Sequence, residues 1–308
     1  MALIGSLTSG VSALKAFSKG LELIGNNIAN VNTTGYKSSS ASFADTFSNT
    51  LRSASASGDS AIQVGTGVQI AGITTSFAQG SLSTTGNSSD LGISGNGYFV
   101  VQDANGKNFA TRDGSFHFDT GGNLVNSQGY SVIDATGAKI QVTGLEKSYD
   151  NTTTPPTFNG YQAVPYSQLA SVSIGTDGKI TMFATDGTSS VYGINYDLTT
   201  ASATPTPASA TEVAKSIGLL SVADQSKLMK EGSDLYDFAS TGSTLAADLG
   251  SPGAGGLGQI QSGTLELSNV DLTGEFANLI TTERSFQAGS RLITVSDSVL
   301  EEIVNLKR

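Results

Sequence analysis

The sequence contains no cysteine, and its 308 residues include a single histidine, His117. The first absence excludes disulfides, thiolate metal ligands and a cysteine nucleophile, and the second leaves no histidine pair for a metal site. Only 14% of the residues are charged, and their net charge of −10 disfavours a nucleic-acid or anionic-membrane partner. No run approaches a membrane-spanning length, and the N-terminus lacks the basic and apolar regions of a signal peptide. We therefore expect no enzyme, no metal, no cofactor and no membrane insertion.

Small uncharged residues are abundant where an average protein has charged ones. The chain has 37 glycines and is rich in serine and threonine. A surface with so little charge is a solubility risk for a lone monomer. It suits a protein that buries much of its exterior against copies of itself.

Apolar residues recur at alternating spacings of three and four over the first thirty residues, which predicts an amphipathic helix. Gly20 and Gly25 each lower helix propensity by about 1 kcal/mol relative to alanine, so this helix needs a partner to persist. The stripe consists of Ile4, Leu7, Val11, Leu14, Leu21 and Ile28.

An apolar residue also falls at every seventh position near the C-terminus, which predicts a second long helix. Two interpretations stay open: an antiparallel helical hairpin inside one domain, or a coiled-coil-like, fibre-forming stalk built from both chain ends. In the second, both stripes serve self-assembly. The C-terminal stripe consists of Leu272, Phe276, Leu279, Phe286, Ile293 and Leu300.

The middle of the chain has the texture of short strands separated by turns. Tyr98–Gln102 and 180–183 are apolar runs, and Asn105-Gly106 is a signal for a two-residue type I′ hairpin. The predicted fold is α+β, mainly β, with the terminal helices pairing into the stalk. We expect a terminal helical domain (1–35 plus 268–308), a partly irregular connector (36–80) that is low in complexity over 38–62, and a β-rich outer domain (81–267) with a loop-rich insertion around 145–210.

No catalytic constellation emerges from the candidate residues. The glycines of 65–67 lack the spacing and the lysine of a phosphate loop. His117 lies between Phe116 and Phe118, which places its side chain on the opposite strand face from theirs, towards solvent or an interface. Most aspartates lie in turns, where they stabilise the bend.

The first predicted helix ends in the segment 26–37, which reads NNIANVNTTGYK. This segment resembles the N-terminal signature of the flagellar rod and hook axial proteins. The residues that match the signature are Asn26, Asn27, Ala29, Asn30, Thr33, Gly35, Tyr36 and Lys37. The resemblance continues over about two thirds of the chain, at both ends, and is loose over 145–262.

The resemblance implies a structural subunit that is exported through the flagellar type III apparatus without a cleaved signal peptide. Copies stack into a helical tube at the cell exterior, with the terminal helices on the inner wall. The implied partners are further copies, the distal rod, the hook–filament junction, the hook cap and the export apparatus.

Within the family, segments such as 41–45 and 290–297 resemble the hook proteins, which we favour. The connector 47–63 is similar to a stretch of the distal-rod subunit, so a drive-shaft subunit is the alternative. A secreted β-rich adhesin with a helical stalk is a third, more distant possibility.

Overall fold

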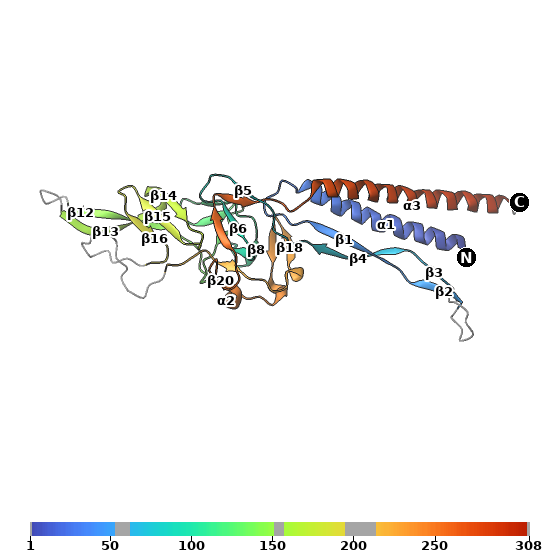
Figure 1. Ribbon diagram of the computed structural model, residues 1–308, viewed down its shortest axis with the longest axis horizontal. Helices are drawn as coiled ribbons and strands as arrows, with labels where there is room; N and C mark the ends of the chain where they lie inside the picture. Colours follow the sequence, from blue (N-terminus) through green and yellow to red (C-terminus); the bar gives the residue numbers. More distant parts are fainter. Residues whose placement is uncertain (1, 53–61, 151–156, 195–213, 307–308) are drawn as a thin grey trace. The chain divides into compact units, whose positions relative to one another are not determined.

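The computed structural model describes residues 2–52, 62–150, 157–194 and 214–306. The chain forms two compact units. Unit 1 comprises Met1–Asn32, Lys37–Ala78 and Asn269–Arg308, and unit 2 comprises Thr33–Tyr36 and Gln79–Ser268. The fold is α+β and mainly β, with the long helices at the two chain ends, as expected (Figure 1). Residues 37–78, expected as a separate connector, cluster with the terminal helices.

The two terminal helices lie side by side in unit 1 (Figure 1). They are α1 (Ala2–Ala29) and α3 (Leu272–Leu306). Asp271 immediately precedes α3, and its carboxylate accepts a hydrogen bond from the Thr273 backbone N–H at 3.0 Å, which satisfies a donor of the first turn. Both helices lie where the apolar spacings of three, four and seven residues predicted them.

A long hairpin of four strands completes unit 1. β1 (Ser39–Asp45) pairs with β4 (Val68–Thr75), and β2 (Ser48–Arg52) pairs with β3 (Ile62–Gly65), all antiparallel. This corrects the expected irregular connector, of which residues 53–61 lie outside the described residues. Its small polar residues form cross-strand hydroxyl pairs, which stabilise strands without an apolar core. These pairs are Ser39–Thr75, Ser40–Thr74 and Thr46–Thr66.

Unit 2 is built on one nine-stranded sheet, ordered β18-β19-β8-β7-β11-β10-β9, with β17 pairing to β7 and β20 pairing to β17. The strands are β7 (Tyr98–Gln102), β8 (Asn108–Thr111), β9 (Phe116–Phe118), β10 (Leu124–Asn126), β11 (Ser131–Val132), β17 (Leu219–Leu220), β18 (Met229–Gly232), β19 (Leu235–Asp237) and β20 (Leu249–Gly250). Strand 98–102 is where its sequence predicted it. The β7–β8 loop, however, runs from Asp103 to Lys107 and is not a two-residue type I′ turn.

Smaller sheets make up the rest of the strands of unit 2. They are the pairs β5 (Leu82–Thr84) with β22 (Thr264–Glu266), β6 (Leu91–Ser94) with β21 (Gln259–Ser262), and β12 (Thr143–Asp150) with β13 (Thr157–Pro165), and the triplet β14 (Leu169–Ile174), β15 (Ile180–Ala184) and β16 (Ser189–Val191). α2 (Leu245–Asp248) is one turn long. β15 lies where the apolar run 180–183 predicted a strand, whereas β12 and β13 lie in a part of the 145–210 insertion for which we expected loops. Residues 151–156 and 195–213 lie outside the described residues.

The core of unit 2 collects side chains from most of these sheets. Leu91, Phe99, Ile140, Ile180 and Ile217 are fully or almost fully buried and belong to one apolar cluster. Because β5, β6, β21 and β22 come from both ends of the unit 2 sequence, their pairing joins residues about 180 positions apart. The strands at the start of the unit 2 sequence therefore pair with the strands at its end, so the chain enters and leaves unit 2 through paired strands.

Candidate functional site

The two predicted stripes lie partly in the contact between α1 and α3 and partly in solvent. On α1, Leu7, Leu14, Leu21 and Ile28 are half-buried and Val11 is 42% exposed, while the Ile4 side chain lies outside the described residues. On α3, Leu279, Phe286 and Ile293 are half-buried, whereas Leu272, Phe276 and Leu300 are exposed. Single copies thus leave part of each stripe available for further contacts.

Small residues let the two helices approach, and the sequence analysis missed them. A Cβ atom on Gly10 would lie 3.1 Å from Ile293 Cγ1, and one on Gly289 would lie 3.4 Å from Leu14 Cδ2. Ser6 Oγ lies 3.3 Å from Ser296 Oγ across the same contact. The seventh-residue search looked only for large apolar residues, although Gly289 and Ser296 are themselves seven apart.

Asn27 connects three elements of unit 1 where the signature begins. Its Nδ2 donates to the Ser39 carbonyl at 2.8 Å and to Glu275 Oε1 at 3.0 Å, and its Oδ1 accepts from the Ser39 N–H at 3.0 Å. A side-chain amide carries two N–H donors and a carbonyl acceptor, and Asn27 uses all three here. Asn27 therefore connects the end of α1 to β1 and α3.

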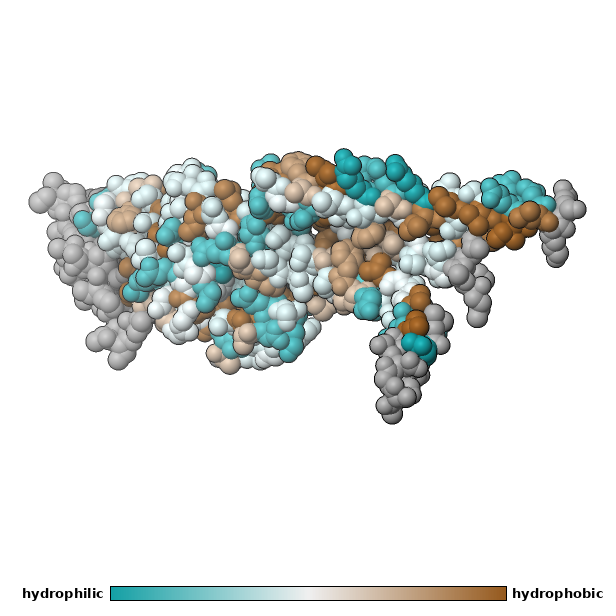
Figure 2. Space-filling view, turned by 45° about the vertical axis from the view of Figure 1, so that its right-hand side comes forward, coloured by the Kyte–Doolittle hydropathy of each residue, from teal (hydrophilic) through white to brown (hydrophobic). Residues whose placement is uncertain are grey.

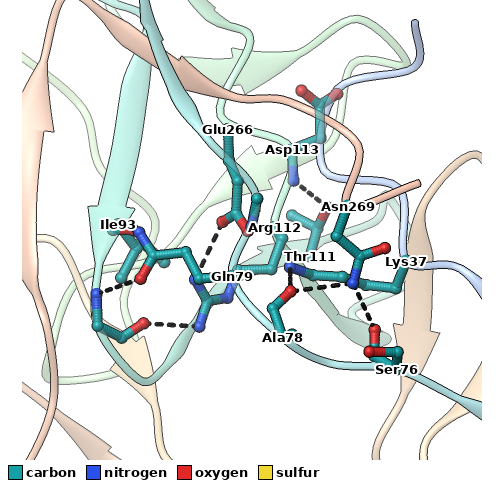
Figure 3. Close-up of polar contacts among 12 residues, drawn as sticks. Lys37, Ser76, Ala78, Gln79, Ile93, Thr111, Arg112, Asp113, Glu266 and Asn269 are labelled. Carbon is teal, nitrogen blue, oxygen red and sulfur yellow. Dashed lines mark hydrogen bonds and ion pairs between the residues drawn. The ribbon is translucent and has the colours of Figure 1, made fainter. Parts of the chain in front are cut away.

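Lys37 and Asn269 share the Ala78 carbonyl in unit 1 (Figure 3). Lys37 Nζ donates to Ala78 O at 2.9 Å, and Asn269 Nδ2 donates to Ala78 O at 3.0 Å and to Ser76 O at 2.8 Å. Asn269 Oδ1 accepts from the Ser38 N–H at 2.8 Å. Lys37 is completely buried, and an ammonium without polar partners would be expensive there. These bonds hold together three stretches of chain that are distant in sequence.

Gly35 and Tyr36, which belong to unit 2, make a tight turn. Gly35 has φ +71, a conformation that favours glycine, and a Cβ atom there would lie 2.5 Å from the Asp113 backbone nitrogen. The Gly35 N–H donates to the Glu266 carbonyl at 2.8 Å. The Tyr36 side chain is buried, with Lys230 Nζ 4.5 Å from its ring centroid. Gly35 therefore permits a turn of the chain at which a larger residue would be strained.

The remaining signature residues cap the helix or lie at its surface. Asn30 Nδ2 donates to the Asn26 carbonyl at 2.9 Å and to its side-chain oxygen at 2.6 Å. Ala29 is exposed and Thr33 is half-buried. The two asparagines satisfy polar groups of the last turn of α1.

A buried ion pair in unit 2 was missed by the sequence analysis (Figure 3). Arg112 Nη1 lies 3.0 Å from Glu266 Oε2, and the two side chains are 4% and 0% exposed. Glu266 Oε1 accepts from the Gly80 N–H at 2.9 Å, and Arg112 Nη2 donates to the Gly95 carbonyl at 2.8 Å. The Arg112 guanidinium carbon also lies 5.2 Å from the Tyr98 ring centroid. The available signal was a single glutamate in the otherwise uncharged stretch 259–270. Arg112, directly after β8 and beside Asp113, gave no comparable signal.

Nothing in the described part of the chain resembles a catalytic or metal centre. His117 is exposed on β9 beside the buried Phe116, as its strand position predicted. The described residues contain no cluster of three histidine, aspartate or glutamate side chains that could hold a metal ion. None of the described helices is long and apolar enough to cross a membrane.

Comparison with known proteins decides the family. Family models match residues 7–37 (flagella basal body rod protein), 92–182 (flagellar hook protein FlgE/F/G D1 domain) and 261–306 (flagellar basal body rod FlgEFG protein C-terminal). The flagellar basal-body rod protein FlgG of Bacillus subtilis is 36% identical over 312 residues, covering 99% of this chain and 100% of that protein. The chain belongs to the flagellar hook and basal-body rod family.

Both branches of the family are similar to the chain over almost its whole length. FlgG of Buchnera aphidicola (subsp. Acyrthosiphon pisum) is 29% identical over 311 residues, with 99% of this chain and 100% of that protein covered. The hook protein FlgE of Salmonella typhimurium is 28% identical over 416 residues, with 98% and 100% covered. The chain is therefore a structural, non-enzymatic component of the bacterial flagellum, an axial subunit, and the adhesin alternative is wrong.

Proposed function

We propose that the chain is a hook subunit whose copies assemble into a helical tube, a flexible coupling between rod and filament. The observation that carries self-assembly is the surface of α3. Gly289 and Ser296 are the only described residues of this helix that are buried, while Phe276, Ile280 and Val295 are 49%, 52% and 60% exposed. Burying apolar area contributes roughly 25 cal/mol per Å², so a tube supplies stabilisation that the monomer lacks.

In this proposal α1 and α3 pair in a coiled-coil-like manner and line the inner wall, and unit 2 faces outwards. The stripe residues that remain half-exposed in one copy pack against neighbouring copies. Export proceeds through the flagellar type III apparatus without a cleaved signal peptide. The further partners are the distal rod, the hook–filament junction and the hook cap.

The outer part of the long hairpin favours a hook. Every side chain that is described on β2 and β3 is exposed, so packing within the subunit does not fix the position of this part. A hook bends as it rotates and needs subunits whose parts can shift. An unpacked hairpin end permits that shift at little free-energy cost.

A rod subunit is the second candidate, favoured by two other observations. The relative at 36% identity carries the name FlgG, and its alignment spans 312 residues against 416 for the Salmonella hook protein. Phe47, Ile62 and Val64 on the hairpin are 93%, 45% and 53% exposed. Contacts between these side chains and a neighbouring copy would pin the hairpin and stiffen the tube.

Electron microscopy of assemblies from the purified chain tests both parts of the proposal: that copies assemble into tubes, and that the tubes are curved as in a hook. We expect curved tubes from the wild type. Leu279→Asp should prevent their formation, because a charge buried in a helical layer costs several kcal/mol per copy. Thr120→Asp, the same charge change on an exposed turn of unit 2, is the matched control and should assemble normally.

Two outcomes would change the assignment. Normal tubes from Leu279→Asp would remove the stripe from the interface. Straight tubes from the wild type that become curved in the double variant Phe47→Ser, Val64→Ser would establish a pinned hairpin, and the rod subunit would replace the hook subunit.

A further inference from the structure

The long hairpin of unit 1 is interrupted at the same level in both of its chains. Residues 46 and 47 separate β1 from β2, and residues 66 and 67 separate β3 from β4. The two interruptions face each other: the Thr46 N–H donates to the Gly67 carbonyl at 2.9 Å. The Thr66 N–H likewise donates to the Phe47 carbonyl at 3.2 Å. We call these four residues the joint, which divides the hairpin into an inner half (β1–β4) and an outer half (β2–β3).

The inner half is held against α1 as far as the joint. The Phe43 and Phe17 ring centroids are 5.8 Å apart, and a Cβ atom on Gly20 would lie 3.3 Å from Phe43 Cζ. Next to the joint, the Val68 N–H donates to Ser12 Oγ at 3.2 Å. Ring packing at one end and this hydrogen bond at the other fix the direction of the inner half relative to the helix.

The outer half lies in solvent. Every side chain that is described on β2 and β3 is exposed, and so is Phe47 in the joint. In Figure 2 the outer half forms a narrow arm that stands away from the helices of unit 1 and carries apolar surface. Packing within the subunit therefore does not fix the direction of the arm.

Two glycines flank Thr66, and steric requirements explain only one of them. Gly67 has φ +145, and a Cβ atom there would lie 2.1 Å from Ser12 Oγ, so the approach to α1 requires glycine. Gly65 does not have a positive φ, and a Cβ atom there would have no atom within 4 Å. A side chain would fit at this position and would strengthen the strand. What glycine adds at position 65 is backbone freedom.

We propose that the joint is a pivot, about which the outer half of the hairpin changes its direction relative to α1, with Gly65 supplying the backbone freedom. This inference rests on the proposed hook subunit and names the place within it at which two parts shift. Dihedral angles change only around the joint, so the contacts of the inner half and the β2–β3 pairing are kept.

The hydrogen bonds of the joint make such a motion inexpensive. The Phe47 carbonyl accepts from the Thr66 hydroxyl at 2.5 Å as well as from the Thr66 N–H. If bending draws the N–H away, the hydroxyl still satisfies the carbonyl. Both residues are exposed, so water also replaces a bond that opens.

Distances between spin labels in assembled tubes test the pivot. The chain has no cysteine, so labels attach only to cysteines that are introduced. Lys15→Cys with Gln63→Cys spans α1 and the outer half, and Lys15→Cys with Gln69→Cys, the control, spans α1 and the inner half; all three positions are exposed. Diluting labelled copies in unlabelled ones restricts each measurement to one copy. We expect the distance distribution of the first pair to be about twice as wide as that of the control.

A substitution at Gly65 tests the source of the freedom. Gly65→Val adds a β-branched side chain where nothing obstructs it, and it should narrow the Gln63 distribution by about half and give straighter tubes in electron micrographs. Gly72→Val, in β4, is the matched control, because its new Cβ would meet only Ser42 Oγ at 3.8 Å. It should leave the distribution and the curvature unchanged.

The failure of the pivot is distinguishable from the failure of the proposed function. Equal widths for the two label pairs would show that the hairpin moves as one body and would overturn the pivot, as would an unchanged distribution in Gly65→Val. Straight tubes from the unsubstituted chain would contradict the hook subunit, and the label pairs would still decide whether the joint bends. A chain that never assembles would contradict the proposed assembly, and the same comparison in the monomer would then decide the pivot.

Discussion

Removing the carboxylate of Glu266 should be among the most destabilising single changes in unit 2. Its side chain is 0% exposed and lies 3.0 Å from Arg112, whose own side chain is 4% exposed. Glu266→Ala leaves that guanidinium buried without its counter-ion and removes the acceptor of the Gly80 N–H. Breaking a buried pair on one side typically costs about 3–5 kcal/mol, and we expect Glu266→Ala to fall in that range.

Two further variants separate charge from packing. Glu266→Gln retains an acceptor for the Gly80 N–H but loses the charge, so its loss of unfolding free energy should be smaller than that of the alanine variant. The double variant Arg112→Met, Glu266→Leu removes both charges and fills similar volume. Replacing a whole buried pair by apolar residues is often neutral or stabilising by about 1–4 kcal/mol.

Urea unfolding of the full-length monomer measures these free energies. The chain has no tryptophan, so its nine tyrosines serve as the fluorescent probe together with circular dichroism. A loss below about 1 kcal/mol for Glu266→Ala would show that water or rearrangement compensates the arginine. A double variant as unstable as Glu266→Ala would show that packing at this position, and not the uncompensated charge, sets the cost.

Two other changes in unit 2 have expected outcomes. Gly35→Ala should lower the melting temperature by several degrees, because φ is +71 and the new Cβ would lie 2.5 Å from the Asp113 backbone nitrogen. The control Gly129→Ala has a similar φ of +81, but its new Cβ would have no atom within 4 Å. A comparable loss in the control would assign the effect to backbone strain alone. Asp234→Asn should raise the melting temperature at pH 7.5, because burial, and then the Asp113 charge, raise the pKa of Asp234 to about 6 against the opposing Lys230. A raised carboxyl pKa penalises the ionised folded state, so the penalty is full above pH 6 and disappears as the pH falls below the unfolded value of about 3.9. After discounting for its exposed part the gain should be about 1 kcal/mol, and a gain that persists in thermal denaturation at pH 3.5 would contradict the electrostatic cause.

The sequence predicted those parts of the fold whose apolar residues have a regular period. Both terminal helices follow from such periods, and the strand 98–102 follows from a short unbroken apolar run. The hairpin over 39–75 does not, because its strands pair through backbone and hydroxyl groups, and serine-rich stretches are equally typical of loops. The β12–β13 pair was missed for a related reason, since Gly144, Gly160 and Pro165 predict turns more strongly than strands.

The candidate assembly surface shows why one periodicity cannot describe α3. The seventh-residue stripe 279, 286 and 293 found the side that is half-buried against α1, and the helix contact there also depends on Gly289 and Ser296, which an apolar search ignores. Ile280, Leu292 and Val295 are 52%, 54% and 60% exposed and do not belong to that stripe, so a seven-residue count passes over them. Apolar periodicity alone therefore identifies the side of α3 that faces α1, and not the apolar residues that the helix leaves exposed.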